Sequence, residues 1–285
     1  MKKFTKITLI IAGILVAIGL VCVTVAFSRG LTTRTLVQLA RDSYFSFDEE
    51  GFHFSIGSIE ENANKENDGD KTSNYEVAES FEDLDIEFGA GELEVRYADV
   101  ANVEVKETGL SNLKVDVKEN TLVIREKTKV NININMDDLD DRSLVVLIPN
   151  GMKLREVDIE IGAAKAELTD LLADEISITV GAGEADISNL TAKQLELEVG
   201  AGEATVTQLS VDALDVDAGL GQVNITLNGI QEEYNYSVEC GIGTVVVGEN
   251  SYSGLGEEQN VRYEGATKKI EIDCGIGKVK VQFQK

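Results

Sequence analysis

The sequence has little of what most enzymes use for catalysis. Its 285 residues include one histidine, one proline, three cysteines and no tryptophan. His53 has no second histidine or cysteine near it, which favours a solvated strand residue over a metal ligand. The chain has no P-loop, no Gly-x-Ser-x-Gly, no His-Glu-x-x-His and no Cys-x-x-Cys motif. These absences argue against nucleotide-dependent enzymes, serine and zinc hydrolases, and dithiol redox enzymes.

Basic residues become scarce after the first 41 positions. The six basic residues before Asp42 face no acidic residue there, so residues 42–285 hold 20 basic and 51 acidic side chains, a net charge of −31. Nucleic acids and anionic membrane surfaces repel a domain of this charge. We therefore expect no nucleic-acid partner, and we expect cationic ligands of a cell envelope instead.

One long uncharged stretch lies near the N-terminus. Met1–Lys6 contain three lysines, and Ile7–Phe27 follow without a single charge, a run long enough to cross a bilayer as a helix. A cleavable signal peptide is the competing interpretation, but its apolar core is normally shorter. We predict a cytoplasmic tail at residues 1–6, a single-pass anchor in the cell membrane at 7–27, and an extracytoplasmic remainder.

Residues 28–75 show no sustained pattern. The aromatic stretch 44–56 is consistent with a small hairpin or a juxtamembrane patch, and residues 57–74 are polar, as in a linker. We therefore expect a juxtamembrane segment and linker over 28–75. The folded domain is predicted at 76–285, irregular over 76–151 and regular over 152–285.

A short phrase, usually Gly-x-Gly after an apolar residue, recurs along this domain. Its leading glycines are Gly89, Gly162, Gly181, Gly200, Gly219, Gly241 and Gly275. The interval is the same at each step from Gly162 to Gly219, and the two intervals after Gly219 are longer. Self-similarity at a period of about 20 residues indicates a repeat architecture, in which each unit buries its apolar face by stacking on its neighbours.

Each repeat has the pattern of two strands about a glycine corner. Apolar residues alternate before the glycine, as at Ile176, Ile178 and Val180, and again after it, as at Ala185 and Ile187. A period of two indicates half-buried strands. The glycines offer a positive φ and no Cβ to crowd the corner. We predict an all-β fold, a β-solenoid of stacked two-strand rungs of about 19 residues, preceded by the transmembrane helix.

Between Phe81 and Pro149 the strand pattern is less regular. Gly89 carries the repeat phrase several repeat lengths before Gly162, so this part is expected to form the first rungs with hairpin insertions. Lys118-Glu119-Asn120 predicts a hairpin turn. Pro149 cannot donate to a ladder and should end a strand.

In-register stacking would align the outward residues two and four places before each leading glycine. The first column is Glu160, Thr179, Glu198, Asp217, Glu239 and Asp273, and the second is Asp158, Ser177, Glu196, Asp215, Ser237 and Glu271. Neighbouring rungs are about 4.8 Å apart, and like charges repel at that spacing unless water or cations screen them.

These columns have two interpretations. They are either a solvated face that keeps an exposed sheet soluble, or a stripe that binds divalent cations or basic envelope ligands. The residues of such a stripe would be Glu196, Glu198, Asp215, Asp217, Glu239 and Asp273. No cofactor is expected beyond weak binding of Ca²⁺ or Mg²⁺.

Cys240 and Cys274 occupy one inward column, immediately before the last two corners. Stacked neighbours have a Cα separation that a disulfide accepts, although their Cβ atoms point the same way. The alternative is a pair of small buried apolar residues. The two corners are expected to be adjacent if residues 249–267 loop out as a hairpin.

From about residue 80 to 285 the chain resembles bacterial membrane-anchored β-strand-repeat proteins of unknown function. These proteins are grouped as candidate adhesins and include the LiaG-like proteins of envelope-stress operons. The resemblance is carried by Phe81–Ile86, by Leu144–Gly151, by the serial Gly-Ala-Gly-Glu phrases and by Ile272–Val279. It implies a β-solenoid outside the cell, and the family offers no established catalytic residues.

We therefore predict a non-catalytic, membrane-anchored binding module, either an adhesin or an accessory of an envelope-stress system with membrane stress-response proteins as partners. A structural cell-surface protein without a specific ligand is one alternative. A carbohydrate-active β-helix enzyme is the other, although Arg262 is the only arginine after residue 155.

Overall fold

The computed structural model describes residues 43–48, 51–56, 72–110, 113–126, 130–131, 142–253 and 256–285. Regular structure in these residues consists of strands and one 3₁₀ helix, η2 (Gln231–Glu233), which confirms the all-β class. The anchor predicted at residues 7–27 lies outside the described residues. Within them, no helix has the length and apolar character needed to span a membrane.

The chain divides into two compact units, residues 1–64 with 129–134, and residues 65–128 with 135–285. In the first unit, β1 (Ser43–Asp48) and β2 (Gly51–Ile56) form an antiparallel hairpin. The short strand β9 (Val130–Asn131) pairs with β1. Of the two interpretations of this aromatic stretch, the structure therefore has the hairpin.

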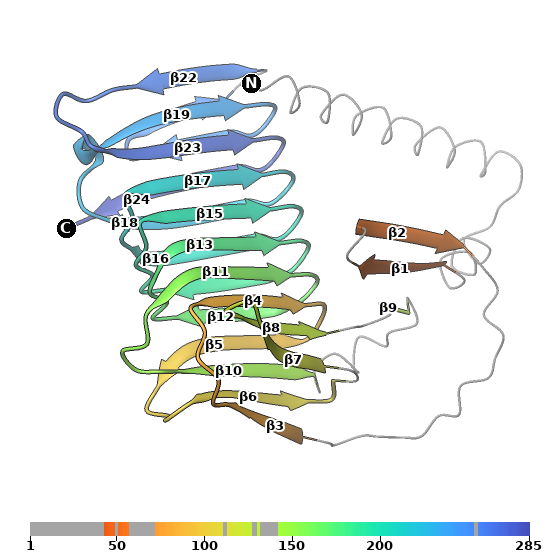
Figure 1. The fold of residues 1–285 in the computed structure, drawn as a ribbon. Coiled ribbons are helices and arrows are strands. Elements are labelled where there is room, and N and C mark those ends of the chain that lie inside the picture. The colour runs from red at the N-terminus through yellow and green to blue at the C-terminus, as the bar shows by residue number, and fades with distance from the viewer. Residues whose placement is uncertain are drawn as a thin grey trace, which may run out of the picture. The chain divides into compact units, whose positions relative to one another are not determined.

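The second unit contains two large sheets (Figure 1). The sheet that we call the acidic sheet runs, in spatial order, β22 (Glu257–Val261), β19 (Tyr234–Cys240), β23 (Lys268–Cys274), β17 (Ala213–Ala218), β15 (Gln194–Val199), β13 (Ala173–Val180), β11 (Leu154–Ile161), β4 (Asp83–Phe88), β8 (Thr121–Glu126) and β7 (Leu113–Lys118). The mixed sheet runs β21 (Asn250–Ser253), β20 (Thr244–Val247), β24 (Lys278–Gln284), β18 (Gln222–Asn228), β16 (Glu203–Leu209), β14 (Glu184–Ser188), β12 (Lys165–Thr169), β5 (Glu92–Ala98), β10 (Ser143–Pro149), β6 (Val103–Thr108) and β3 (Thr72–Val77).

Central strands of both sheets pair in parallel at the repeat interval. In the acidic sheet Ile161 is opposite Val180, and Val180 is opposite Val199. In the mixed sheet Ala166 is opposite Ala185 in the same way. Because the side-chain period of a strand is two, this register places every apolar position against its equivalent in the next repeat.

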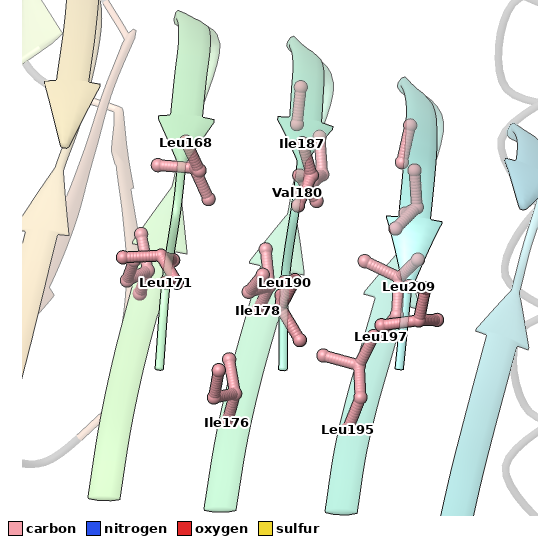
Figure 2. Packing of buried hydrophobic residues seen from close by; sticks show 14 of the residues in the cluster. Leu168, Leu171, Ile176, Ile178, Val180, Ile187, Leu190, Leu195, Leu197 and Leu209 are labelled. Atoms are coloured by element: carbon pink, nitrogen blue, oxygen red, sulfur yellow. The ribbon is translucent and has the colours of Figure 1, made fainter. Parts of the chain in front are cut away.

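The core lies between the inward faces of the two sheets. Ile178, Leu197 and Val216 are fully buried at one position of successive repeats, and Figure 2 shows Ile178 and Leu197 on neighbouring strands. Leu190 and Leu209 fill the equivalent place beside the other corner. Each such side chain contributes about 1.5–3 kcal/mol relative to exposure, so the stack is held together mainly by these apolar rows.

The first repeat stacks directly on the second despite the long segment of chain between their glycines. The Gly162 amide donates to the Phe88 carbonyl at 2.9 Å, and the Ala163 amide donates to the Gly89 carbonyl at 2.8 Å. The intervening chain supplies β6 to β8 and β10, and β7 and β8 form the expected hairpin, with positive φ at Glu119 and Asn120. The edge strand β3 begins at Thr72, a few residues before the predicted domain start.

At the other end, the spatial order of the repeats differs from the order expected along the chain. β23 lies between β17 and β19, so that Asp273 is opposite both Asp217 and Glu239. The interval from Gly219 to Gly241 is longer than the regular one, and the short helix η2 lies in it. The longer connection lets the chain pass over the place in the stack next to β17 and β18, which β23 and β24 then fill.

The prediction that residues 249–267 loop out as a single hairpin is wrong. They supply β21, antiparallel to β20 in the mixed sheet, and β22, antiparallel to β19 in the acidic sheet. One strand therefore covers each edge that the last parallel repeat leaves open, because an unpaired edge would expose backbone donors and acceptors. Cys240 and Cys274 are nonetheless in adjacent repeats, as expected.

The corner glycines are required for their missing Cβ. A Cβ on Gly219 would lie 2.9 Å from the Gly200 carbonyl oxygen, and one on Gly200 would lie 2.8 Å from the Gly181 carbonyl oxygen. Among the corner glycines of the described chain only Gly91 has a positive φ, 121°. The expectation that these corners use positive φ is thus wrong for the regular repeats. Glycine is needed there because the backbones of neighbouring repeats lie too close together to leave room for a side chain.

The opposite corner of each repeat does use a left-handed residue. Asp170, Asn189 and Gln208 recur at the repeat interval and have φ values of 61°, 55° and 56°. Asn and Asp tolerate this region better than most residues. Sequence analysis missed this second corner, although its regular spacing was available as a signal.

Candidate functional site

The predicted acidic columns exist on the outward face of the acidic sheet. In spatial order the first is Glu160, Thr179, Glu198, Asp217, Asp273 and Glu239, and the second is Asp158, Ser177, Glu196, Asp215, Glu271 and Ser237. Both continue onto β4 with Glu87 and Asp85, which sequence analysis left out. The available signal was their place two and four residues before Gly89.

Crowding raises the pKa of several carboxyl groups in the columns. The pKa of Asp217 is raised to about 6, because partial burial penalises its charged form and Asp273, Asp215 and Glu198 repel it. Burial also raises the pKa of Glu160, and Glu87 adds repulsion there. The face therefore holds negative charge at an electrostatic cost that a cationic group would reduce.

At the β8 end a cationic side chain already bridges the two columns. Arg125 donates from Nη2 to Oδ2 of Asp85 at 2.7 Å, and its Nε lies 3.1 Å from Oε1 of Glu87. The hydrogen bond to Asp85 is the main cause that raises the pKa of Arg125. Asp85 and Glu87 are alternate residues of one strand, so they share a face. The spacing between the columns thus matches one guanidinium group.

Further along the stack, the columns have few basic neighbours. Lys269 lies 2.6 Å from Glu271 at the outer side of the second column. Within the described residues, no lysine or arginine forms an ion pair with Glu198 or Asp217. The charge of these two carboxylates is therefore not balanced by an ion pair with a described basic side chain.

The columns do not form a coordination cage. No group of three or more histidine, cysteine, aspartate or glutamate side chains in the described part of the chain is arranged to hold a metal ion. Outward side chains of in-register parallel strands point the same way, so successive carboxylates form a row and do not converge on one centre. Any cation bound here would screen a row of charges.

An apolar row lies at the middle residues of the corners, between the end of the acidic-sheet strands and the start of the mixed-sheet strands, where Leu220 and Ile276 line a hollow with Gln222 and Lys278. Leu220, Ile276 and Ile242 are 65 %, 59 % and 66 % exposed, more than any other large apolar side chain of the described residues. They are consecutive in the stack, since the Ile276 amide donates to Gly219 and the Ile242 amide to Gly275. The earlier corners have alanine in this place. Sequence analysis missed the row, although the change from Ala to Leu and Ile was visible.

Cys240 and Cys274 are buried on the inner side of the same corners. They are opposite one another in β19 and β23, and both are free thiols. Burial and then the neighbouring Cys240 raise the pKa of Cys274 to about 11. Both residues pack as small apolar side chains at the position of Val180, Val199 and Ala218 in earlier repeats, and the raised pKa keeps Cys274 protonated at neutral pH.

The family assignment rests on this repeat region. The family model described as Toastrack DUF4097 matches residues 81–255. The chain belongs to the Toastrack family. The resemblance to adhesin-like β-repeat proteins is thereby confirmed, and the two-sheet arrangement described above is the Toastrack repeat fold of this chain.

Several solved structures are similar to this Toastrack chain. A proposed cell-adhesion protein from Clostridium sporogenes has 15 % identity and a TM-score of 0.45, with 75 % of this chain and 100 % of the other covered. A proposed adhesin from Bacteroides fragilis has 16 % identity and a TM-score of 0.40, with coverages of 75 % and 97 %. A proposed lipid-binding protein from Parabacteroides distasonis has 14 % identity and a TM-score of 0.36, with the same coverages. No curated protein matches the sequence.

Proposed function

We propose that this Toastrack protein is a non-catalytic binding module, a β-solenoid held outside the cell by the apolar span 7–27, whose acidic face binds cationic ligands of the envelope. The observation that carries the proposal is the contact of the Arg125 guanidinium group with both Asp85 and Glu87. It is an internal example of a cationic group bound across both columns. The same two columns continue over the next repeats without such a partner at Glu198 and Asp217.

The repeat register supports the solenoid. Parallel partners one repeat apart in both sheets give each repeat the same contacts as its neighbours, which is the arrangement of a quasi-one-dimensional stack. Such a stack presents a long, regular surface, which suits the binding of extended or repeating ligands better than the enclosure of a small substrate.

The extracytoplasmic placement rests on the sequence. The lysines at residues 2, 3 and 6 and the uncharged span after them favour a short inner tail and an outer domain. Protease added to intact cells should then remove the β domain and leave the anchor with the membrane. A mature N-terminus near residue 27, or a domain protected until the cells are lysed, would contradict this placement.

Cation binding by the acidic face can be measured through stability. A ligand that binds only the folded chain raises its melting midpoint, so millimolar Ca²⁺ or Mg²⁺ should raise the midpoint of the full-length chain more than NaCl of equal ionic strength. Asp217→Asn combined with Glu198→Gln should abolish most of the difference, and the matched control Glu184→Gln with Glu203→Gln, on the mixed sheet, should retain it. Equal midpoints in all salts, together with no binding of oligolysine, would leave a structural surface protein as the better description.

A further inference from the structure

The exposed apolar row and part of the first acidic column lie on the same three repeats. Leu220, Ile276 and Ile242 are the corner residues that follow β17, β23 and β19, and Asp217, Asp273 and Glu239 are the column residues of these strands. Each apolar residue is three positions after its acidic partner along the chain. We call these six residues the corner patch.

The opposite end of the stack provides an internal comparison. At the β4 corner the middle residue is Ala90, which is buried, and the columns there hold Arg125. The large exposed corner residues therefore lie at the end of the stack away from Arg125. Isoleucine side chains that are 59–66 % exposed do not help to keep a protein soluble. A contiguous apolar row of this kind is typical of an interaction surface.

Charge restricts what can cover the corner patch. A second copy of the chain would bring another domain of net charge −31 against the acidic column, and an anionic membrane would be repelled in the same way. The occupant must therefore be apolar opposite the corner residues and basic opposite Asp217 and Asp273. An amphipathic cationic segment has both properties.

The spacing of the patch favours a helical segment. Adjacent strands are about 4.8 Å apart, so the three apolar residues span two intervals of that length. One turn of an α-helix rises about 5.4 Å, whereas alternate residues of an extended strand are about 6.6–6.8 Å apart. A helix laid along the stack can thus place one apolar side chain on each corner and one basic side chain beside each column residue.

Resting on the proposed function of the acidic face, we propose that the corner patch binds an amphipathic, cationic α-helix, with its apolar side on Leu220, Ile276 and Ile242 and its basic side on Asp217, Asp273 and Glu239. The patch thus selects amphipathic helices from other cationic ligands. The remainder of the face binds positive charge without this selectivity.

The test measures binding of three fluorescent peptides to the full-length chain in phosphatidylcholine nanodiscs, with empty nanodiscs as the blank. The first peptide is long enough for five helical turns and has leucine on one helical face and lysine on the adjacent face. The second has the same composition in scrambled order, and the third is oligolysine of equal charge. The amphipathic peptide should bind at least tenfold more tightly than the scrambled one. Its preference should persist in 0.5 M NaCl, because salt weakens the charge interactions and leaves the apolar contact.

Two variants identify the surface. The combination of Leu220→Ser, Ile242→Ser and Ile276→Ser should remove the preference and leave oligolysine binding unchanged. The control Leu172→Ser, which changes an apolar side chain 42 % exposed at the opposite corner of its repeat, should retain it. Circular dichroism and melting midpoints check that both variants fold, and the single change Ile276→Ser serves if the triple variant does not.

The remaining outcomes distinguish the two proposals. Equal affinity for amphipathic and scrambled peptides, or a preference that survives the triple variant, overturns the helix site and leaves the cationic-ligand function standing. Failure of all three peptides to bind overturns both. Binding of the wild type, but not of the triple variant, to anionic lipid vesicles would show that a lipid surface covers the corner patch instead.

Discussion

Replacing Gly221 by alanine tests how closely the corners stack, because a new Cβ there would meet both a backbone and a buried side chain. A Cβ at this position would lie 2.5 Å from the Gly202 carbonyl oxygen and 2.5 Å from Cγ1 of Val199. Ordinary contacts of this kind are longer by about 1 Å, so either the backbone of the preceding repeat or the buried valine must move. Overpacking costs about 1–3 kcal/mol. Weakening the 3.0 Å hydrogen bond from the Gln222 amide to Gly202 adds about 1 kcal/mol.

We therefore expect Gly221→Ala to lower the free energy of unfolding by about 2–4 kcal/mol, which lowers the melting midpoint of a domain of this size by about 4–16 °C. Circular dichroism during heating and during urea titration measures both quantities. Gly151→Ala is the control, because a Cβ there meets nothing within 4 Å and only its φ of 83° is unfavourable. Its cost should be about 1–2 kcal/mol. If Gly221→Ala is no more destabilising than the control, the corners do not stack as described.

Two further substitutions and one labelling experiment have expected outcomes. Asp217→Asn should stabilise the chain by about 1 kcal/mol at pH 8, a value reduced for the partial exposure of the carboxyl group, and should not stabilise it at pH 4. The folded pKa of about 6 lies above the ordinary 3.8, so the wild type loses stability as pH rises between these values. Equal urea midpoints for both chains at pH 8 would refute the pKa shift. Leu197→Ala should cost about 3 kcal/mol in urea unfolding, and a cost no larger than that of Leu172→Ala would contradict its burial. Alkylation of the unreduced, unfolded chain should label Cys240 and Cys274, whereas recovery of a bridged peptide by mass spectrometry would show a disulfide.

The strands and their register could be predicted because the alternation and the regular glycine spacing are both strong and mutually consistent. The alternation fixes which side chains point inward, and equal spacing places Val180 opposite Val199. The columns followed from the same register, including Asp217 and Glu198. These features depend on local pattern alone, which a sequence displays directly.

The order of the last two repeats could not be predicted, because the phrases at Cys240 and Cys274 carry the same signal. Which of them stacks on β17 depends on the path of the connections. The extra residues before Gly241, which include η2, can be interpreted only once the structure shows that the chain passes over the position beside β17 that β23 later fills. The contact of Arg125 with Asp85 could not be predicted either, since the pairing of β4 with β8 brings together residues 40 positions apart. Both features are long-range, and neither has a periodic signature.

The most direct measurement of the central claim is a carboxyl-carbon NMR titration of the full-length chain with hexalysine. Binding across the columns should shift the carboxyl resonances of Asp217 and Glu198 and should lower the pKa of Asp217 from about 6, because a nearby ammonium group favours the charged form. The carboxyl resonance of Glu203, on the mixed sheet, should stay in place. If the Asp217 and Glu198 resonances do not respond, or respond no more than Glu203, the acidic face is not a binding surface for cations.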